Sequence, residues 1–183
     1  MIQSRELGEA AAKGRRSWRE AAAKGRRSWL PLGLGALAAL AVAAIGGSMT
    51  DVGPWYQALA KPSWKPPDWA FAPIWTVIFA LAALSVANAW WAVRNRGARA
   101  AIVILYLLTG ILNIAWSALF FSLKRPDWSL FEVVFLWAAI ATLIVVLWRR
   151  ARIAALLLVP YLLWVSIAAF LNLEIVRLNQ PFG

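Results

Sequence analysis

Five long apolar runs constrain the fold of this chain more than any other feature of its sequence. A helix needs about 20 apolar residues to cross a bilayer. A membrane β-barrel would instead show segments of about ten residues with alternating polarity, whereas these runs are continuously apolar. The sequence therefore predicts an all-α membrane protein, a five-transmembrane-helix bundle, with spans at about 30–49, 70–93, 100–123, 130–148 and 153–175.

The residue types that are missing narrow the chemistry. The chain contains no histidine and no cysteine, so it lacks the commonest general base, the usual axial ligand of haem iron and any thiolate nucleophile. Only Glu132 and Glu174 are charged within the runs, and both lie near an end. We expect no metal site, no required cofactor and no nucleic-acid partner, with lipid surrounding the bundle.

Lysine and arginine alternate between the two sides of the predicted bundle. The N-terminal tail carries eight, and the connections 94–99 and 149–152 carry three each, against five on the opposite side. Cytoplasmic loops are enriched in Lys and Arg. We therefore expect the N-terminus in the cytoplasm and the C-terminus on the far side of the membrane.

The N-terminal tail, residues 1–29, is basic and contains a perfect duplication. EAAAKGRRSW stands at Glu9–Trp18 and again at Glu20–Trp29. It is either a local duplication without a function of its own or a basic segment that lies on anionic lipid, where each Lys or Arg contributes about 1 kcal/mol. We assign no site to this tail, nor to the C-terminal end, residues 180–183.

The connection before the second span is rich in proline and tryptophan. KPSWKPPDWAFAPIW, residues 61–75, holds four prolines and three tryptophans. Proline fixes the backbone and removes a donor, so this loop is expected to be stiff and extended. Its tryptophans would form either an aromatic belt at the membrane interface or part of a lid over the bundle. The lid residues would be Lys61, Pro62, Trp64, Pro66, Pro67 and Trp69.

Three stretches together resemble the TspO/MBR family (translocator protein, tryptophan-rich sensory protein, peripheral-type benzodiazepine receptor). They are WYQALAKPSWKPPDWAFAPIWT at 55–76, NIAWSALFFSLKR at 113–125 and VPYLLWVSIAAFLNLEIVRLN at 159–179. The resemblance covers about residues 30–179, and the last stretch is most similar to alphaproteobacterial members. It implies a bacterial, multi-pass, often homodimeric membrane protein whose pocket between helices, covered by the first loop, binds porphyrins such as protoporphyrin or haem.

The residues themselves favour aromatic faces for a flat ligand. Helical spacing places Trp75 on one face of the second span, Asn113 with Trp116 on the third, and Trp164 with Ala168 on the fifth. The family pattern implies ligand-binding roles for members of this set. The expected ligand-binding residues are Tyr56, Trp75, Asn113, Trp116, Trp164, Ala168 and Asn172. Plain packing of the tryptophans, and hydrogen bonds between helices for the amides, are the alternatives.

Two further features leave alternatives open. The family's sterol motif calls for a tyrosine where Leu173 stands, so sterol binding is not expected from this sequence. In the first span, Gly35, Ala39, Ala43 and Gly47 recur every fourth residue, which suits close helix packing within the bundle or a dimer seam.

For function, the sequence favours a porphyrin-binding sensory or regulatory protein. The rivals are a light-dependent enzyme that degrades porphyrin and a transporter of porphyrin or lipid-like ligands. No residue is predicted to be catalytic. A charged residue deep in a span, as ion coupling would require, is missing from the five runs, which argues against transport.

Overall fold

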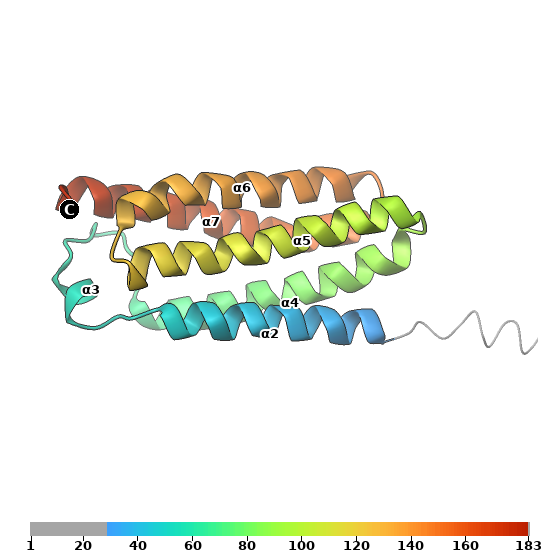
Figure 1. The fold of residues 1–183 in the computed structure, drawn as a ribbon, viewed down its shortest axis with the longest axis horizontal. Coiled ribbons are helices and arrows are strands. Elements are labelled where there is room, and N and C mark those ends of the chain that lie inside the picture. Colours follow the sequence, from blue (N-terminus) through green and yellow to red (C-terminus); the bar gives the residue numbers. More distant parts are fainter. Residues whose placement is uncertain (1–28, 183) are drawn as a thin grey trace, which may run out of the picture. The chain divides into compact units, whose positions relative to one another are not determined.

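The computed structural model describes residues 29–182, and the long elements in that range are helices (Figure 1). Five of them are long and apolar enough to cross a membrane, which confirms the predicted fold class. In chain order, the elements of the described residues are α2 (Leu30–Met49), the short α3 (Pro54–Ala58), α4 (Asp68–Ala92), α5 (Arg96–Ser117) with the π-helical turn η1 (Ala118–Ser122), α6 (Pro126–Trp148) and α7 (Arg152–Asn179). The long ones are α2, α4, α5 with η1, α6 and α7.

Several helices extend beyond the apolar runs into polar sequence. Helix α4 begins at Asp68, whose carboxylate suits the positive end of the helix dipole. Helix α6 begins at Pro126, because proline fits the first helical position. Pro73 lies in the second turn of α4, because this helix begins at Asp68, ahead of the apolar run at residue 70. Hydropathy marks the part of a helix inside lipid, not its ends.

The helices pack as antiparallel neighbours in the order α5, α6, α7, α4, and α2 lies along α4 and α5 (Figure 1). Glycines allow this close approach. A Cβ on Gly35 would come within 3.1 Å of the Ala83 carbonyl oxygen on α4, and one on Gly110 of α5 would come within 3.0 Å of Val42. Gly47 has nothing within 4 Å of its Cβ position. The spacing noticed in the first span therefore serves internal packing at Gly35.

Buried polar side chains link the helices inside the apolar core. The Ser85 hydroxyl on α4 donates to the Ala154 carbonyl on α7 at 2.6 Å and lies 2.6 Å from the Tyr106 hydroxyl on α5. A further link lies at the surface of the bundle, where the exposed Trp137 of α6 donates from Nε1 to Ser166 Oγ on α7 at 2.9 Å. Each link satisfies polar groups that lipid could not satisfy.

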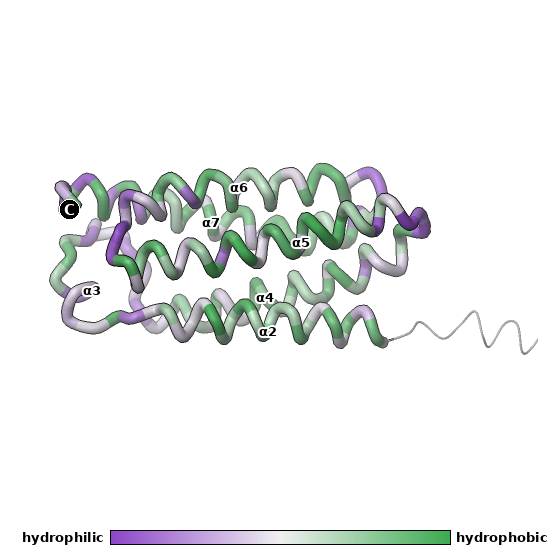
Figure 2. The backbone as a smooth tube through the Cα atoms, viewed as in Figure 1, coloured by the Kyte–Doolittle hydropathy of each residue, from purple (hydrophilic) through white to green (hydrophobic). Residues whose placement is uncertain are grey.

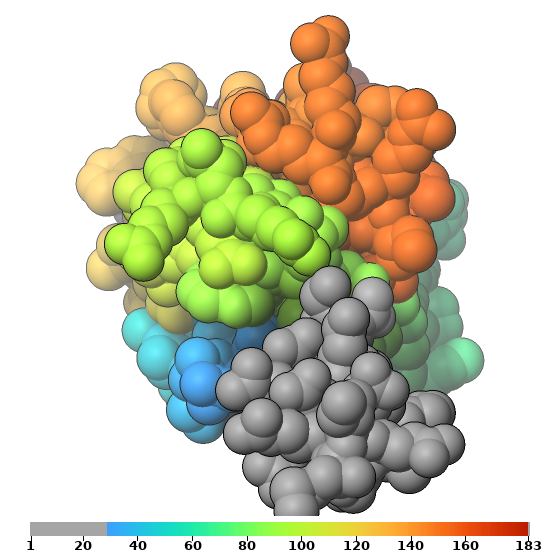
Figure 3. All heavy atoms as spheres, turned by 90° about the vertical axis from the view of Figure 1, so that its right-hand side faces the viewer, coloured from blue at the N-terminus to red at the C-terminus, as the bar shows by residue number. Residues whose placement is uncertain are grey.

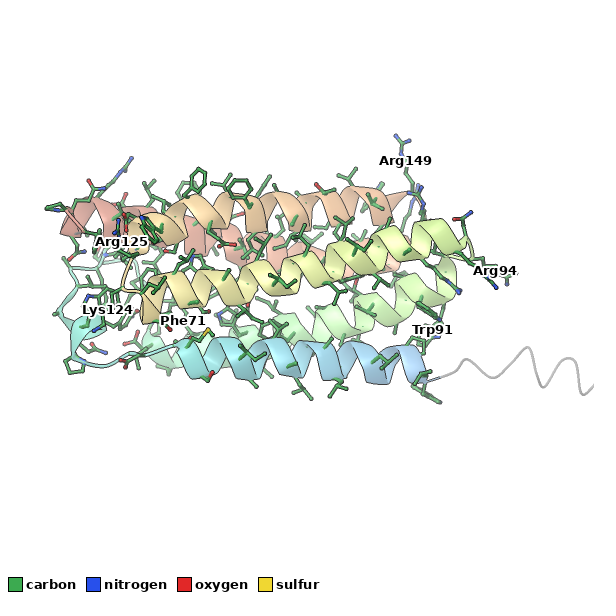
Figure 4. The ribbon with its side chains drawn as sticks, viewed as in Figure 1. Phe71, Trp91, Arg94, Lys124, Arg125 and Arg149 are labelled. Atoms are coloured by element: carbon green, nitrogen blue, oxygen red, sulfur yellow. The ribbon has the colours of Figure 1, made fainter. Side chains whose placement is uncertain are left out.

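Charged residues collect at the two ends of the bundle, and the middle is apolar (Figure 2). Arg94 and Arg149 lie at one end, whereas Lys124 and Arg125 lie at the other (Figure 4). Figure 3 looks onto the first end, where the α4–α5 and α6–α7 connections reach the surface. Arg99 also closes the C-terminus of α4 there, donating from its guanidinium to the carbonyls of Trp90 and Val93.

Removing the Ser85 hydroxyl should loosen the bundle. Ser85→Ala leaves the Tyr106 hydroxyl and the Ala154 carbonyl without this partner, and we expect a loss of about 1–2 kcal/mol of unfolding free energy. Tyr106→Phe should cost less because Ser85 keeps its bond to Ala154. Reversible unfolding in mixed micelles measures the free energy of unfolding of each variant. Ser48→Ala, which removes an exposed hydroxyl bonded within its own helix, is the control, and an equal effect of both serine changes would contradict the assignment.

Candidate functional site

Aromatic side chains from four segments meet near one end of the bundle. They come from α3 and its flank, α4, α5 with η1, and α7. We call them the aromatic cluster, and its members are Trp55, Tyr56, Phe71, Trp75, Phe79, Trp116, Phe120, Phe121, Tyr161 and Trp164. Phe71 lies toward the end that carries Lys124 and Arg125 (Figure 4).

The part of the cluster nearest this end is built on η1. Trp116 stacks on Phe120, with ring centroids 5.1 Å apart and planes at 26°. Trp55 meets Phe120 edge-on at 6.2 Å, and Tyr56 lies 5.7 Å from Phe121. The wider turn allows the consecutive residues Phe120 and Phe121 both to be buried. A single π turn inside an α-helix is often found at functional sites.

The deeper part of the cluster joins α4 to α7. Trp75 stacks on Phe79 at 5.3 Å and meets Tyr161 edge-on at 6.0 Å, while Phe71 meets Trp164 edge-on at 5.6 Å. Asn113 of α5 donates its amide N–H to the Tyr161 hydroxyl at 3.0 Å. Three helices therefore present flat apolar faces and one polar pair to the same region.

Two indole N–H groups in the cluster lack an acceptor. Trp116 Nε1 and Trp164 Nε1 are both buried without a hydrogen-bond partner among the residues that the structure describes. Burying an unsatisfied donor costs about 1–3 kcal/mol. Most buried polar groups in proteins are paired, so such an exception calls for a specific explanation. Both donors suit a ligand that carries carbonyl or carboxylate oxygens.

The structure brings most of the expected ligand-binding residues together. Tyr56, Trp75, Asn113, Trp116 and Trp164 all belong to the aromatic cluster or bond directly to it. Ala168 is half-buried on α7, one turn beyond Trp164.

Asn172 is placed differently from the other expected residues. It is fully buried. With its amide oriented to suit its neighbours, its oxygen accepts from the Ser129 hydroxyl at 3.0 Å and the Leu130 N–H at 2.9 Å, and its nitrogen donates to the Pro126 carbonyl at 3.1 Å. All of these partners lie on α6. The bonds match the interhelical role that the sequence left open for the amides.

The connection between α2 and α4, residues 50–67, contains α3, and we call it the Trp/Pro loop. It is fastened at two points. Asn179, the last residue of α7, accepts from the Ala60 N–H at 2.8 Å and donates to the Ala60 carbonyl at 2.9 Å. The Lys61 ammonium donates to the carbonyls of Tyr56 at 2.5 Å and Leu59 at 3.0 Å. Lysine thereby satisfies carbonyls at the C-terminus of α3, where the helix dipole also favours a cation.

These contacts change the acid–base properties of the loop. Burial, followed by repulsion from Lys65, lowers the pKa of Lys61. Burial, with the nearby Asp68 as the smaller cause, raises the pKa of Tyr56 to about 12. Lys65 forms an ion pair with Asp68, and its ammonium lies 5.6 Å from the ring centroid of Phe71. Lys61 therefore bonds within the loop, and Lys65 pairs with the first residue of α4.

All six predicted lid residues are at least partly exposed. Trp64 and Trp69 are exposed on the chain, Trp69 by 76%, as residues of an interfacial aromatic belt would be. The apolar loop side chains that reach the cluster are Trp55, Tyr56 and Leu59. Pro66 is half-buried and Pro67 is exposed, directly before α4.

The expected ligand-binding residues left out six members of the cluster, which are Trp55, Phe71, Phe79, Phe120, Phe121 and Tyr161. Phe71 and Phe121 were not selected, although both lie in stretches that resemble the family. Asn179 was not selected either, and its partner Ala60 is 119 positions away in the chain. The only local signal for Asn179 was a polar amide at the end of an apolar helix.

Comparison with known proteins identifies relatives along most of the chain. Residues 35–178 match the TspO/MBR family. The chain is 39% identical over 125 residues to a tryptophan-rich protein TspO of Chlorobaculum tepidum, covering 68% of this chain and 79% of that protein. It is 34% identical over 146 residues to a tryptophan-rich sensory protein of Cereibacter sphaeroides (78% and 88%). It is 33% identical over 128 residues to the translocator protein of Homo sapiens (69% and 75%).

Proposed function

The chain belongs to the TspO/MBR family, and from that premise we propose that it is a membrane sensory protein that binds a porphyrin in the aromatic cluster. The Trp/Pro loop covers the bound ligand. Tyr56, Trp75, Asn113, Trp116 and Trp164 contact it. Ala168 leaves room for it, and Asn172 positions α7 against α6.

The observation that carries this proposal is the pair of buried indole N–H groups on Trp116 and Trp164. They lie among rings that offer flat stacking surfaces. A porphyrin has a large aromatic face and carboxylate side chains, so it supplies both the stacking partner and the missing acceptors. The rings contact one another in the structure, so the ligand must separate them as it enters.

Porphyrin binding should depend on these tryptophans. Saturable quenching of tryptophan fluorescence by protoporphyrin measures the affinity. Trp164→Ala or Trp75→Ala should weaken binding by about 1–3 kcal/mol, if stacking on this ring resembles stacking on a base. Trp164→Phe keeps an aromatic face and removes the N–H, so it should cost about 0.5–1.5 kcal/mol.

The matched control for these variants is Trp148→Ala. Trp148 is half-exposed at the end of α6 near Arg149 and lies outside the cluster, so its loss should leave the affinity unchanged. Unchanged affinity in both Trp75→Ala and Trp164→Ala would move the binding site elsewhere.

Loosening the loop should speed ligand release. Replacing Pro66 and Pro67 with glycine increases the loop's conformational freedom, and Asn179→Ala removes both bonds that hold Ala60. Either change should raise the porphyrin dissociation rate severalfold, with a smaller effect on association, because a covered ligand leaves through the loop. Stopped-flow release measures both rates. If the loop is only an interfacial belt, neither rate should move.

We also propose that the N-terminus is cytoplasmic and the C-terminus lies on the far side of the membrane. The distribution of Lys and Arg supports this orientation. A reporter that is active only in the periplasm, fused after residue 183, should be active. Activity of a cytoplasm-specific reporter at the same position would reverse the proposed orientation.

A further inference from the structure

A groove on the outer side of α6 lies outside the aromatic cluster. It has a volume of about 440 Å³, within the range of roughly 300–1,000 Å³ typical of small-molecule sites. Its walls come from η1 and from the first three turns of α6. The lining residues are Leu119, Asp127, Trp128, Phe131, Glu132 and Phe135.

The groove has a polar rim and an apolar floor. At the rim, Arg125 Nε donates to Asp127 Oδ1 at 2.8 Å, and its guanidinium lies 4.3 Å from the ring centroid of Trp128. Further along the helix, Phe131 and Phe135 meet edge-on at 5.2 Å and are both exposed. The rim suits the membrane interface, and the two phenylalanines suit a hydrocarbon chain lying along α6.

Glu132 is the residue of this groove whose buried carboxyl group has no hydrogen-bond partner among the described residues. Its side chain is 8% exposed, and both carboxyl oxygens are buried without a hydrogen-bond partner in the part of the chain that the structure describes. It lies five residues beyond Asp127, so it is about 7.5 Å deeper along the helix axis. The nearby cation Arg125 is already bonded to Asp127. A carboxyl group left unpaired at this depth is a functional-site hypothesis by default.

The apolar surroundings of Glu132 favour a neutral hydroxyl group over an ammonium group as the partner of its carboxyl group. An ammonium group would have to lose its own hydration among apolar walls, which costs more than burying a neutral hydroxyl. A hydroxyl group can both donate and accept. Its O–H donates to the carbonyl oxygen of a neutral carboxyl group, and its oxygen accepts from the O–H of the same carboxyl group. The rotatable bonds of the glutamate let the carboxyl turn from behind the wall into the groove.

We propose that this groove is a second, lipid-facing site that binds a neutral lipid with a hydroxyl head group. The hydroxyl bonds to Glu132, and the chain lies along Phe131 and Phe135. The lining residues of the groove are not members of the aromatic cluster, although Glu132 lies close enough to Tyr161 of the cluster to act on it electrostatically.

Carbodiimide labelling tests the site in the full chain, reconstituted in phosphatidylcholine nanodiscs. Dicyclohexylcarbodiimide adds to a protonated carboxyl group from the lipid phase, and rearrangement to the N-acylurea keeps every atom of both reactants, so mass spectrometry locates the product. We expect labelling at Glu132. Monooleoylglycerol at twice its dissociation constant should slow it about threefold, and methyl oleate, which has no donor, should not.

Three results would overturn the proposal. The first is that Glu132 is not labelled. The second is that methyl oleate protects Glu132 as well as monooleoylglycerol does. The third is that only oleylamine protects it, which would indicate a cation site. Glu174→Gln, which alters the carboxylate paired with Arg177 on α7, is the control and should leave the labelling of Glu132 unchanged.

A second measurement separates hydrogen bonding from charge. A long-chain alcohol carrying a diazirine should crosslink to the segment 119–135. Glu132→Gln keeps a donor and an acceptor, so crosslinking should persist, whereas Glu132→Leu should reduce it about fivefold, the factor of a typical hydrogen bond. Equal crosslinking in the Gln and Leu variants, or equal loss in both, contradicts a hydroxyl site. Helical circular dichroism of both variants should match that of the unchanged protein, and it reports that they are folded.

Discussion

In hydrocarbon, every backbone and side-chain polar group must find its partner within the protein. That constraint explains why the five runs form helices, and it also explains the polar residues between them. Ser85 joins α4, α5 and α7, and Asn172 joins α7 to the first turn of α6. Because the helices share lipid-like surfaces, these few bonds and the glycine contacts at Gly35 and Gly110 fix how the helices are placed.

The same constraint makes the buried polar atoms without a partner the most informative groups in the structure. Trp116, Trp164 and Glu132 hold the buried side-chain polar atoms that lack a partner within residues 29–182. In a soluble protein, water could satisfy such groups, but a bilayer offers little water at that depth. The two indoles are donors among aromatic faces, and the carboxyl group borders an apolar groove. The missing partners therefore differ in chemistry, which is why two separate sites are proposed for them.

The sequence predicted what depends on local pattern and missed what depends on long-range or irregular geometry. Hydropathy located the five spans, and helical spacing placed Trp75, Asn113 and Trp164 on faces that meet. The π turn that buries Phe121 together with Phe120 breaks the 3.6-residue period. No spacing rule links Asn179 to Ala60, and Glu132 reads in sequence only as a charge near a helix end.

The Trp/Pro loop shows how one segment can face two environments. Trp64 and Trp69 are exposed on the chain, whereas Tyr56 is buried against Phe121. Exposed tryptophans are typical of membrane interfaces, whereas Lys61 and Asn179 hold the other part of the loop against α3 and α7. Between them, prolines limit the conformations that the segment can adopt. The loop can therefore move over the cluster only by giving up Asn179 or by drawing its tryptophans away from the interface. Under the proposed function, either cost would slow the release of a bound porphyrin.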